Sequence, residues 1–167
     1  DAIVYVLRAF KDDDVPGPDD PLEHLRVVEL ELALADLETV ETRLNRVKKT
    51  ARVDKGNQEE AGLLQRAYDV LAEGTPIYRS ALSASDREEL APHFLLTNRR
   101  VLAVVNVGEN ELDTIPAMEE RVRSELCPPG SRQEHEIEVL GMSVQIEAEA
   151  AQLSDEDRAE MLEALGL

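Results

Sequence analysis

A long heptad repeat of apolar residues is the feature that most limits what this chain can fold into. Its members are spaced alternately by three and four residues: Leu30, Ala33, Leu37, Val40, Leu44, Val47 and Ala51. That spacing places them on one side of an α-helix, which we expect over about residues 21–52. At 1.5 Å per residue such a helix is about 45 Å long, and its apolar side requires a packing partner.

A second helix, predicted over residues 58–73, offers that partner. The same spacing recurs in it, at Ala61, Leu64, Tyr68 and Leu71. Gly74 and Pro76 end this helix, and residues 53–57 supply the turn between the two helices. Two apolar seams joined by a short turn predict an antiparallel coiled-coil hairpin, with two ordinarily packed helices of a bundle as the alternative.

The rest of the chain alternates short apolar runs with helical patterns. Buried strands are predicted over 2–7, 101–107 and 136–142, and helices over about 114–126, 145–153 and 154–166. A capping-box pattern at Ser85–Glu88 predicts one more short helix that stops at Pro92. This order indicates an α/β protein with a parallel sheet and a helical insertion. We expect residues 1–20 and 85–167 to form the sheet region and residues 21–84 the insertion.

Composition excludes several classes of protein. The 167 residues carry 18 Lys and Arg against 36 Asp and Glu, a net charge of −18, which argues against a general nucleic-acid-coating protein. No apolar run approaches the roughly 20 residues that span a bilayer, so we do not expect a membrane protein. Cys127 is the sole cysteine, so an intrachain disulfide is excluded, and with three histidines it leaves little material for a zinc site.

Polar residues follow two of the predicted strands at the point where ligands bind in open α/β sheets. The first group is Asn106-Val107-Gly108-Glu109 and the second begins at Ser143-Val144. GTPase-type proteins place Asn-Lys-x-Asp and Ser-Ala-Lys motifs at these two places. Taken separately, however, Asn106 is also a common turn former and Ser143 a common helix N-cap.

The chemistry of the first motif concerns the purine base. An Asn amide binds the purine edge and ties neighbouring loops together, and an Asp carboxylate accepts two hydrogen bonds from guanine. Here Glu109 is one methylene longer than Asp, and Val107 replaces the Lys that usually stacks on the base. These differences weaken guanine selectivity and leave adenine as a candidate. Ser143 and Val144 would form the second base loop through backbone N–H groups.

A basic cluster lies at the far end of the predicted hairpin. Its members fall within thirteen positions of an otherwise acidic chain: Arg43, Arg46, Lys48, Lys49, Arg52 and Lys55. One interpretation is a solvated helix face. The other is a tip that contacts RNA phosphates, without base stacking because no aromatic residue lies among the cations.

The whole chain resembles the Obg-like ATPase family, also called YchF, a branch of the P-loop NTPases. The most specific matches are the stretch from Glu29 to Leu44 and the Asn-x-x-Glu at 106–109. Residues 1–10, Ser143–Glu149 and Leu153–Gly166 support them. The resemblance implies a G domain with an inserted helical arm and a TGS domain after it, cytoplasmic location, association with the ribosome and its RNA, and hydrolysis of ATP in preference to GTP.

The same resemblance implies that this chain carries only some of the family's machinery. It has no G-x-x-x-x-G-K-[ST] motif, and it opens without methionine at a predicted strand. We therefore expect a fragment that binds the base of ATP or GTP, lacks the catalytic P-loop, the Mg²⁺ ligands and the TGS domain, and shows no ATPase activity alone. The alternative is a non-catalytic coiled-coil adapter. The sequence sets no oligomeric state.

Overall fold

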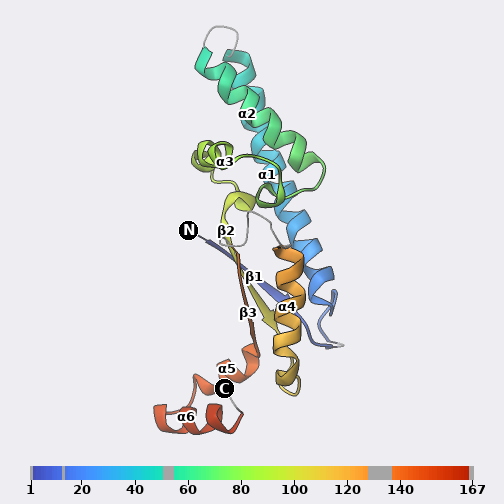
Figure 1. Cartoon of the computed structure of the whole chain (residues 1–167), viewed down its shortest axis with the longest axis vertical. Coiled ribbons are helices and arrows are strands. Elements are labelled where there is room, and N and C mark those ends of the chain that lie inside the picture. The colour runs from blue at the N-terminus through green and yellow to red at the C-terminus, as the bar shows by residue number, and fades with distance from the viewer. Residues whose placement is uncertain (1, 13, 51–54, 128–136, 166–167) are drawn as a thin grey trace. The chain divides into compact units, whose positions relative to one another are not determined.

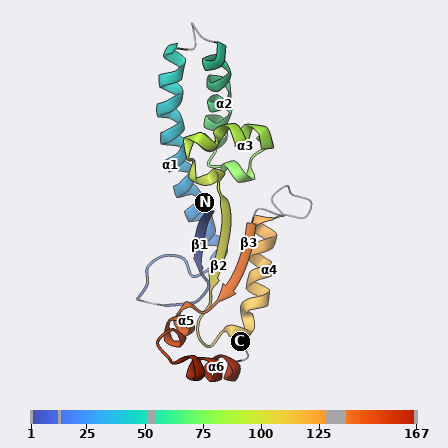
Figure 2. The same cartoon turned by 90° about the vertical axis from the view of Figure 1, so that its left-hand side faces the viewer.

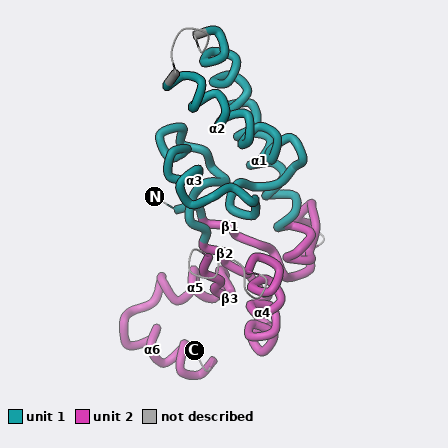
Figure 3. The backbone as a smooth tube through the Cα atoms, turned by 45° about the horizontal axis from the view of Figure 1, so that its top comes forward, with its two compact units in different colours: residues 1–3, 25–101 teal, residues 4–24, 102–167 magenta. Residues whose placement is uncertain are grey.

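The computed structural model describes residues 2–12, 14–50, 55–127 and 137–165 of the chain. They divide into two compact units, which Figure 3 colours separately. The first unit comprises residues 1–3 and 25–101, and it is mainly helical. The second comprises residues 4–24 and 102–167 and holds most of the sheet. Helices pack against each other in the first unit, and a helix packs against the sheet in the second.

Two helices that lie side by side dominate the first unit (Figures 1 and 2): α1 (Pro21–Thr50) and α2 (Lys55–Ala72). Apolar residues from both helices share one buried cluster, namely Ala33, Val40, Leu44, Val47, Leu63, Leu64, Ala67 and Leu71. At its margin Arg43 forms an ion pair with Glu60 at 2.9 Å. Burial of the facing apolar rows accounts for the pairing of these helices.

The buried side of α1 departs from the predicted seam in the first half of the helix. Ala33, Val40, Leu44 and Val47 are buried as predicted, whereas the prediction for Leu30 was wrong, because that side chain is 48% exposed. Ala51 lies outside the described residues. Two acidic residues, Glu29 and Asp36, are buried instead. Periodicity of apolar residues cannot reveal them, because their burial depends on partners far along the chain.

Asp36 is almost fully buried because its carboxylate is saturated with hydrogen bonds. It accepts the backbone N–H of Leu96, the backbone N–H of Thr97 and the Thr97 hydroxyl, each at 2.7 Å. The Thr97 hydroxyl oxygen in turn accepts the backbone N–H of Ile77 at 3.1 Å. One side chain of α1 therefore organises two short 3₁₀ turns, Ile77–Arg79 and Leu96–Asn98.

Glu29 has a similar role about two helical turns nearer the start of α1. Its carboxylate accepts a hydrogen bond from the Tyr78 hydroxyl and forms an ion pair with the Arg79 Nε at 2.7 Å. Burial opposes the charge on Arg79, but the hydrogen bond and ion pair with Glu29 prevail and raise the pKa of the guanidinium. The acids on α1 thus hold the segment that follows α2.

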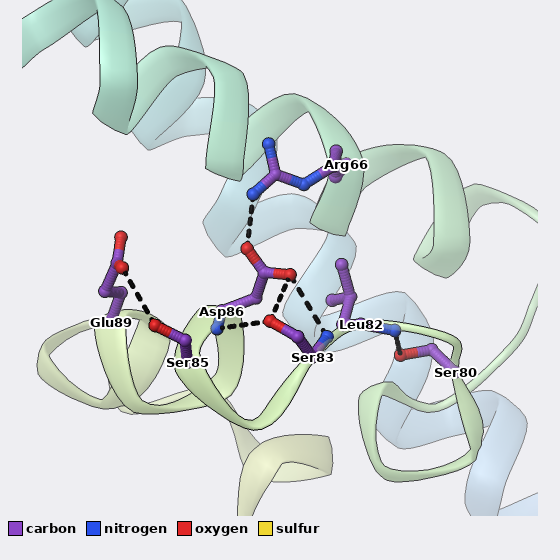
Figure 4. A network of polar contacts seen from close by, with 7 residues as sticks. All are labelled: Arg66, Ser80, Leu82, Ser83, Ser85, Asp86 and Glu89. Atoms are coloured by element: carbon purple, nitrogen blue, oxygen red, sulfur yellow. Dashed lines mark hydrogen bonds and ion pairs between the residues drawn. The ribbon is translucent and has the colours of Figure 1, made fainter.

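The short helix α3 (Ala84–Leu90) has a capping box, but it begins earlier than predicted. Ser83, rather than Ser85, is the N-cap: its hydroxyl accepts the Asp86 N–H, and the Asp86 carboxylate accepts the Ser83 N–H, both at 3.1 Å (Figure 4). Two overlapping Ser-x-x-acid patterns compete here, and Arg66 favours the first by an ion pair with Asp86. Hydrogen bonds from Ser83 and Arg66 lower the pKa of Asp86.

A three-stranded parallel sheet, ordered β1-β2-β3, forms the centre of the second unit (Figure 2). Its strands are β1 (Ala2–Arg8), β2 (Arg100–Asn106) and β3 (Ile137–Met142). The prediction of a fully buried first strand was wrong for one face. Tyr5 and Leu7 are buried, but Val4 and Val6 are each 54% exposed, because no element of the described residues covers that face.

Helix α4 (Ile115–Leu126) packs against β3 and begins within one residue of the predicted start, with Pro116 in its first turn. The approach is close at Gly141, where an added Cβ would lie 2.6 Å from the Ile115 Cγ2. The Gly141 N–H also donates to the Glu119 carboxylate at 2.6 Å. Only glycine allows the strand backbone to approach the helix this closely.

Two further helices, α5 (Val144–Ala150) and α6 (Asp155–Ala164), complete the second unit. Ser154 caps α6 near the predicted start of that helix, since its side chain accepts the Asp157 N–H at 3.2 Å. None of the helices in the described portion of the chain combines the length and apolar character needed to cross a membrane.

Candidate functional site

A hollow of about 770 Å³ lies in the second unit at the carboxyl ends of the strands. Three segments line it: the loop after β1, the loop after β2, and the junction of β3 with α5. Their lining residues are Phe10, Lys11, Asp12, Asn106, Val107, Gly108, Glu109, Asn110, Ser143, Val144, Gln145 and Ala148. The structure thus brings the two predicted loops together in one cavity.

Asn106, the last residue of β2, joins the two loops. Its side-chain Oδ1 accepts the Val144 N–H at 2.9 Å, and its backbone oxygen accepts the Ala9 N–H at 2.8 Å. The Oδ1 is therefore occupied, whereas the Nδ2 of the same amide has no partner among the described residues. Its two N–H groups remain able to bond to a ligand in the hollow.

The neighbouring residues divide into buried and exposed ones. Val107 is buried, and its N–H donates to the Met142 oxygen at 3.0 Å, so that it extends the sheet rather than reaching a ligand with its side chain. Glu109 is exposed at the rim of the hollow.

Ser143 precedes α5 and is 4% exposed, and its Oγ has no hydrogen-bond partner in the described portion of the chain. A buried hydroxyl without a partner is unusual, because the lost hydrogen bond costs about 1–3 kcal/mol. Ser143 lines the hollow. Its Oγ is thus a buried polar atom without a partner beside that hollow.

Phe10 is a residue that reasoning from the sequence missed. It follows closely on the end of β1 and lines both the large hollow and a smaller one of about 220 Å³. Asn106 is likewise shared by the two hollows. A signal existed, since only two phenylalanines occur in the chain and this one stands near a strand end. Its ring offers a flat apolar surface beside the polar loops.

The far end of the loop that carries Phe10 is also fixed. Asp20 caps α1 by accepting the N–H groups of Leu22 and Glu23 at 2.9 and 3.1 Å. It also pairs with Arg121 of α4 at 2.6 Å. Against the opposing effect of desolvation, the bonds to Arg121 and to the two backbone amides lower the pKa of Asp20.

The predicted basic cluster belongs to the first unit, whereas the hollow belongs to the second. Arg43 is paired with Glu60, and Lys48 donates to the Gln65 side chain at 2.8 Å. Arg46 and Lys49 are exposed on α1. Arg52 lies outside the described residues, and the Lys55 side chain is likewise not described.

The described residues offer no basis for a metal centre. No group of three or more His, Cys, Asp or Glu side chains among them is placed to hold a metal ion. We assign no step to the Mg²⁺ that the family resemblance implies.

A parallel α/β sheet whose polar loops meet at the carboxyl ends of its strands defines the class of α/β proteins that bind ligands at that edge. No family model matches the chain. The ribosome-binding ATPase YchF of Bacillus subtilis is 34% identical over 172 aligned positions, which cover 100% of this chain and 46% of that protein. Obg-like ATPase 1 of Caenorhabditis elegans is 32% identical over 116 positions, 66% of this chain and 29% of that protein.

The solved structure of the Schizosaccharomyces pombe YchF GTPase matches with a TM-score of 0.76 at 26% identity, covering 99% of this chain and 46% of that one. The chain belongs to the Obg-like ATPase and YchF family. It spans about half the length of the curated relatives it matches.

Proposed function

We propose that this chain supplies the base-recognition loops and the helical arm of a nucleotide-binding ATPase that acts on the ribosome. In this proposal residues 1–20 and 85–167 are the two segments of a G domain, and residues 21–84 are an inserted coiled-coil arm. The Bacillus subtilis relative, named above as a ribosome-binding ATPase, supports it. The observation that carries it is the Asn106–Val144 hydrogen bond, which joins two loops over one hollow.

The proposed chemistry assigns each polar atom a role toward the purine. The free Nδ2 of Asn106 donates to the acceptor nitrogen on the purine edge, and the unpartnered Ser143 Oγ lies in the same wall. Glu109 stands at the rim, where a longer carboxylate than Asp loses the geometry that pairs with guanine. ATP is therefore the proposed ligand, with GTP binding more weakly.

Replacement of Asn106 by alanine tests this assignment. Asn106→Ala removes the donor to the base and also releases the Val144 N–H, so we expect ATP affinity to fall about 10- to 100-fold, as for loss of roughly 1–3 kcal/mol of hydrogen bonding. Calorimetric titration of the purified chain with ATP and GTP measures it. Asn45→Ala, an exposed change on α1, is the matched control and should leave affinity unchanged. Equal affinity of the Asn106→Ala and unsubstituted chains would refute the role of this amide.

The tip of the proposed arm is the second element of the proposal. Arg46 and Lys49 are exposed cations on α1 that face solvent in a chain of net charge −18. We expect the double change Arg46→Glu with Lys49→Glu to weaken co-sedimentation with ribosomes. It should also reduce the slope of log affinity against log salt by about 1.4–1.8, because two phosphate contacts are lost.

The control for the tip is the charge reversal Arg158→Glu on α6, an exposed residue of the other unit, which reverses one charge where the tip variant reverses two. An unchanged salt slope in the tip variant would remove RNA phosphates as its target. Ribosome binding through the tip by a chain that binds neither ATP nor GTP would instead favour the adapter function. The 167 residues contain no phosphate-binding G-x-x-x-x-G-K-[ST] motif, so we expect no ATP hydrolysis by them alone.

A further inference from the structure

We infer that Arg8 is a positioning residue for the nucleotide base: its guanidinium holds the described part of the loop after β1, residues 9–12 and 14–20, so that Phe10 stays in the wall of the large hollow. This inference rests on the proposed function, since it concerns the same hollow. Arg8 does not itself line that hollow, but it controls a segment that does.

Arg8 is the last residue of β1 and is 8% exposed. Its side chain donates to three backbone oxygens of the returning half of the loop. The Nη1 bonds to the Val15 oxygen at 2.7 Å, the Nε bonds to the Pro18 oxygen at 3.0 Å, and the Nη2 bonds to the Gly17 oxygen. The side chain of the last residue of β1 therefore bonds to the returning part of the loop that follows this strand.

The chemistry of these contacts requires arginine. Three carbonyl oxygens along four residues converge on one planar group, and only the guanidinium fork presents donors in matching directions. A buried cation must be well hydrogen-bonded, so the side chain and the loop conformation stabilise each other. Gly17, with φ of +103°, supplies the backbone conformation that turns its oxygen toward Arg8.

The backbone of Arg8 fixes the same loop at its other end. Its N–H donates to the His24 Nδ1, in the first turn of α1, at 3.0 Å. The strand end and the helix start are thereby held together around the small hollow, whose wall includes Arg8, His24 and Phe10. Phe10 lines both this small hollow and the large one, so in this inference a displaced loop also displaces the ring.

The experiment uses the absence of tryptophan from the chain. Phe10→Trp introduces a single indole whose fluorescence reports the position of this residue. In that background Arg8→Gln should increase quenching by acrylamide at least twofold and weaken ATP binding about tenfold, as expected for a displaced binding group. Arg8→Lys keeps one donor group, so its acrylamide quenching and its ATP affinity should lie between those of the Arg8 chain and those of the Arg8→Gln variant. Arg158→Gln, a change of the same charge on exposed α6, should alter neither quantity.

A second variant keeps the inference testable if Arg8→Gln unfolds the chain. Gly17→Ala meets no atom within 4 Å and acts only through its positive φ, so it should shift the same two readings in the same direction. Unchanged acrylamide quenching in both variants would overturn the inference. If quenching increases but the unsubstituted chain binds no nucleotide, Arg8 still holds the loop and the proposed function is what fails.

Discussion

Asp36→Ala is expected to lower the free energy of unfolding by about 3 kcal/mol or more. The substitution leaves the backbone N–H groups of Leu96 and Thr97 and the Thr97 hydroxyl without their shared acceptor. Each unsatisfied buried donor costs about 1–3 kcal/mol, and water can reach only some of them. Urea unfolding followed by circular dichroism gives the value directly.

Two comparisons separate hydrogen bonding from helix effects at this position. Glu38→Ala lies on the same helix with an exposed side chain and should change stability by less than about 0.5 kcal/mol. Asp36→Asn keeps the size of the side chain but replaces one carboxylate oxygen by an NH₂ group that faces an N–H donor. It should therefore lower the free energy of unfolding nearly as much as Asp36→Ala. A fully stable Asp36→Asn variant would mean that the carboxylate is not the organising acceptor.

Gly141→Ala is expected to cost about 1–3 kcal/mol, the range for overpacking a well-filled interior. The new methyl group would lie 2.6 Å from the Ile115 Cγ2 and 3.1 Å from the Glu119 Cγ, so that α4 must move away from β3. That movement also lengthens the bond from the Gly141 N–H to Glu119. Thermal unfolding of the variant measures the loss.

A double-mutant cycle tests the cause. Ile115→Ala removes the atom that the new methyl group meets. The free energy of unfolding lost in the double variant should therefore be smaller, by about 0.5–3 kcal/mol, than the sum of the losses in the two single variants. Gly62→Ala is the control for the glycine substitution itself. Its Cβ meets only the Arg66 Nη1 at 3.9 Å on a helix, and it should stabilise by about 0.5–1 kcal/mol. Additive effects at positions 141 and 115 would contradict the steric explanation.

Local patterns predicted the order of helices and strands, because each element carries its own periodicity and end signals. Pro116 in the first turn of α4 and the Ser154 cap of α6 are examples of local signals at a helix boundary. The errors arose where distant residues decide. Leu30 fits the heptad repeat, but Glu29 and Asp36 are the buried residues because Arg79 and Thr97 lie against them.

The candidate site shows the same division. Asn106 ends β2 and Ser143 directly follows β3, so the α/β order was enough to predict that the two residues lie at one edge of the sheet; their role toward a ligand stays a prediction. Phe10 was missed, although its position just after a strand end was a signal, because the sequence does not show the carbonyl oxygens to which the Arg8 side chain bonds in the same loop. Backbone acceptors are equally present at every position of a sequence.

The bonds between Asp36 and residues 96–97 also determine when, during synthesis of the chain, the first unit can complete its packing. The donor and acceptor are 60 and 61 positions apart. At translation rates of about 5–20 residues per second, the helix that carries the carboxylate emerges some 3–12 seconds before its donors exist. During that interval the Asp36 carboxylate is hydrated, whereas a leucine at this position would expose apolar surface to solvent. The first unit can reach its final packing only when the chain has grown past Thr97, because the partners of Asp36 are then present.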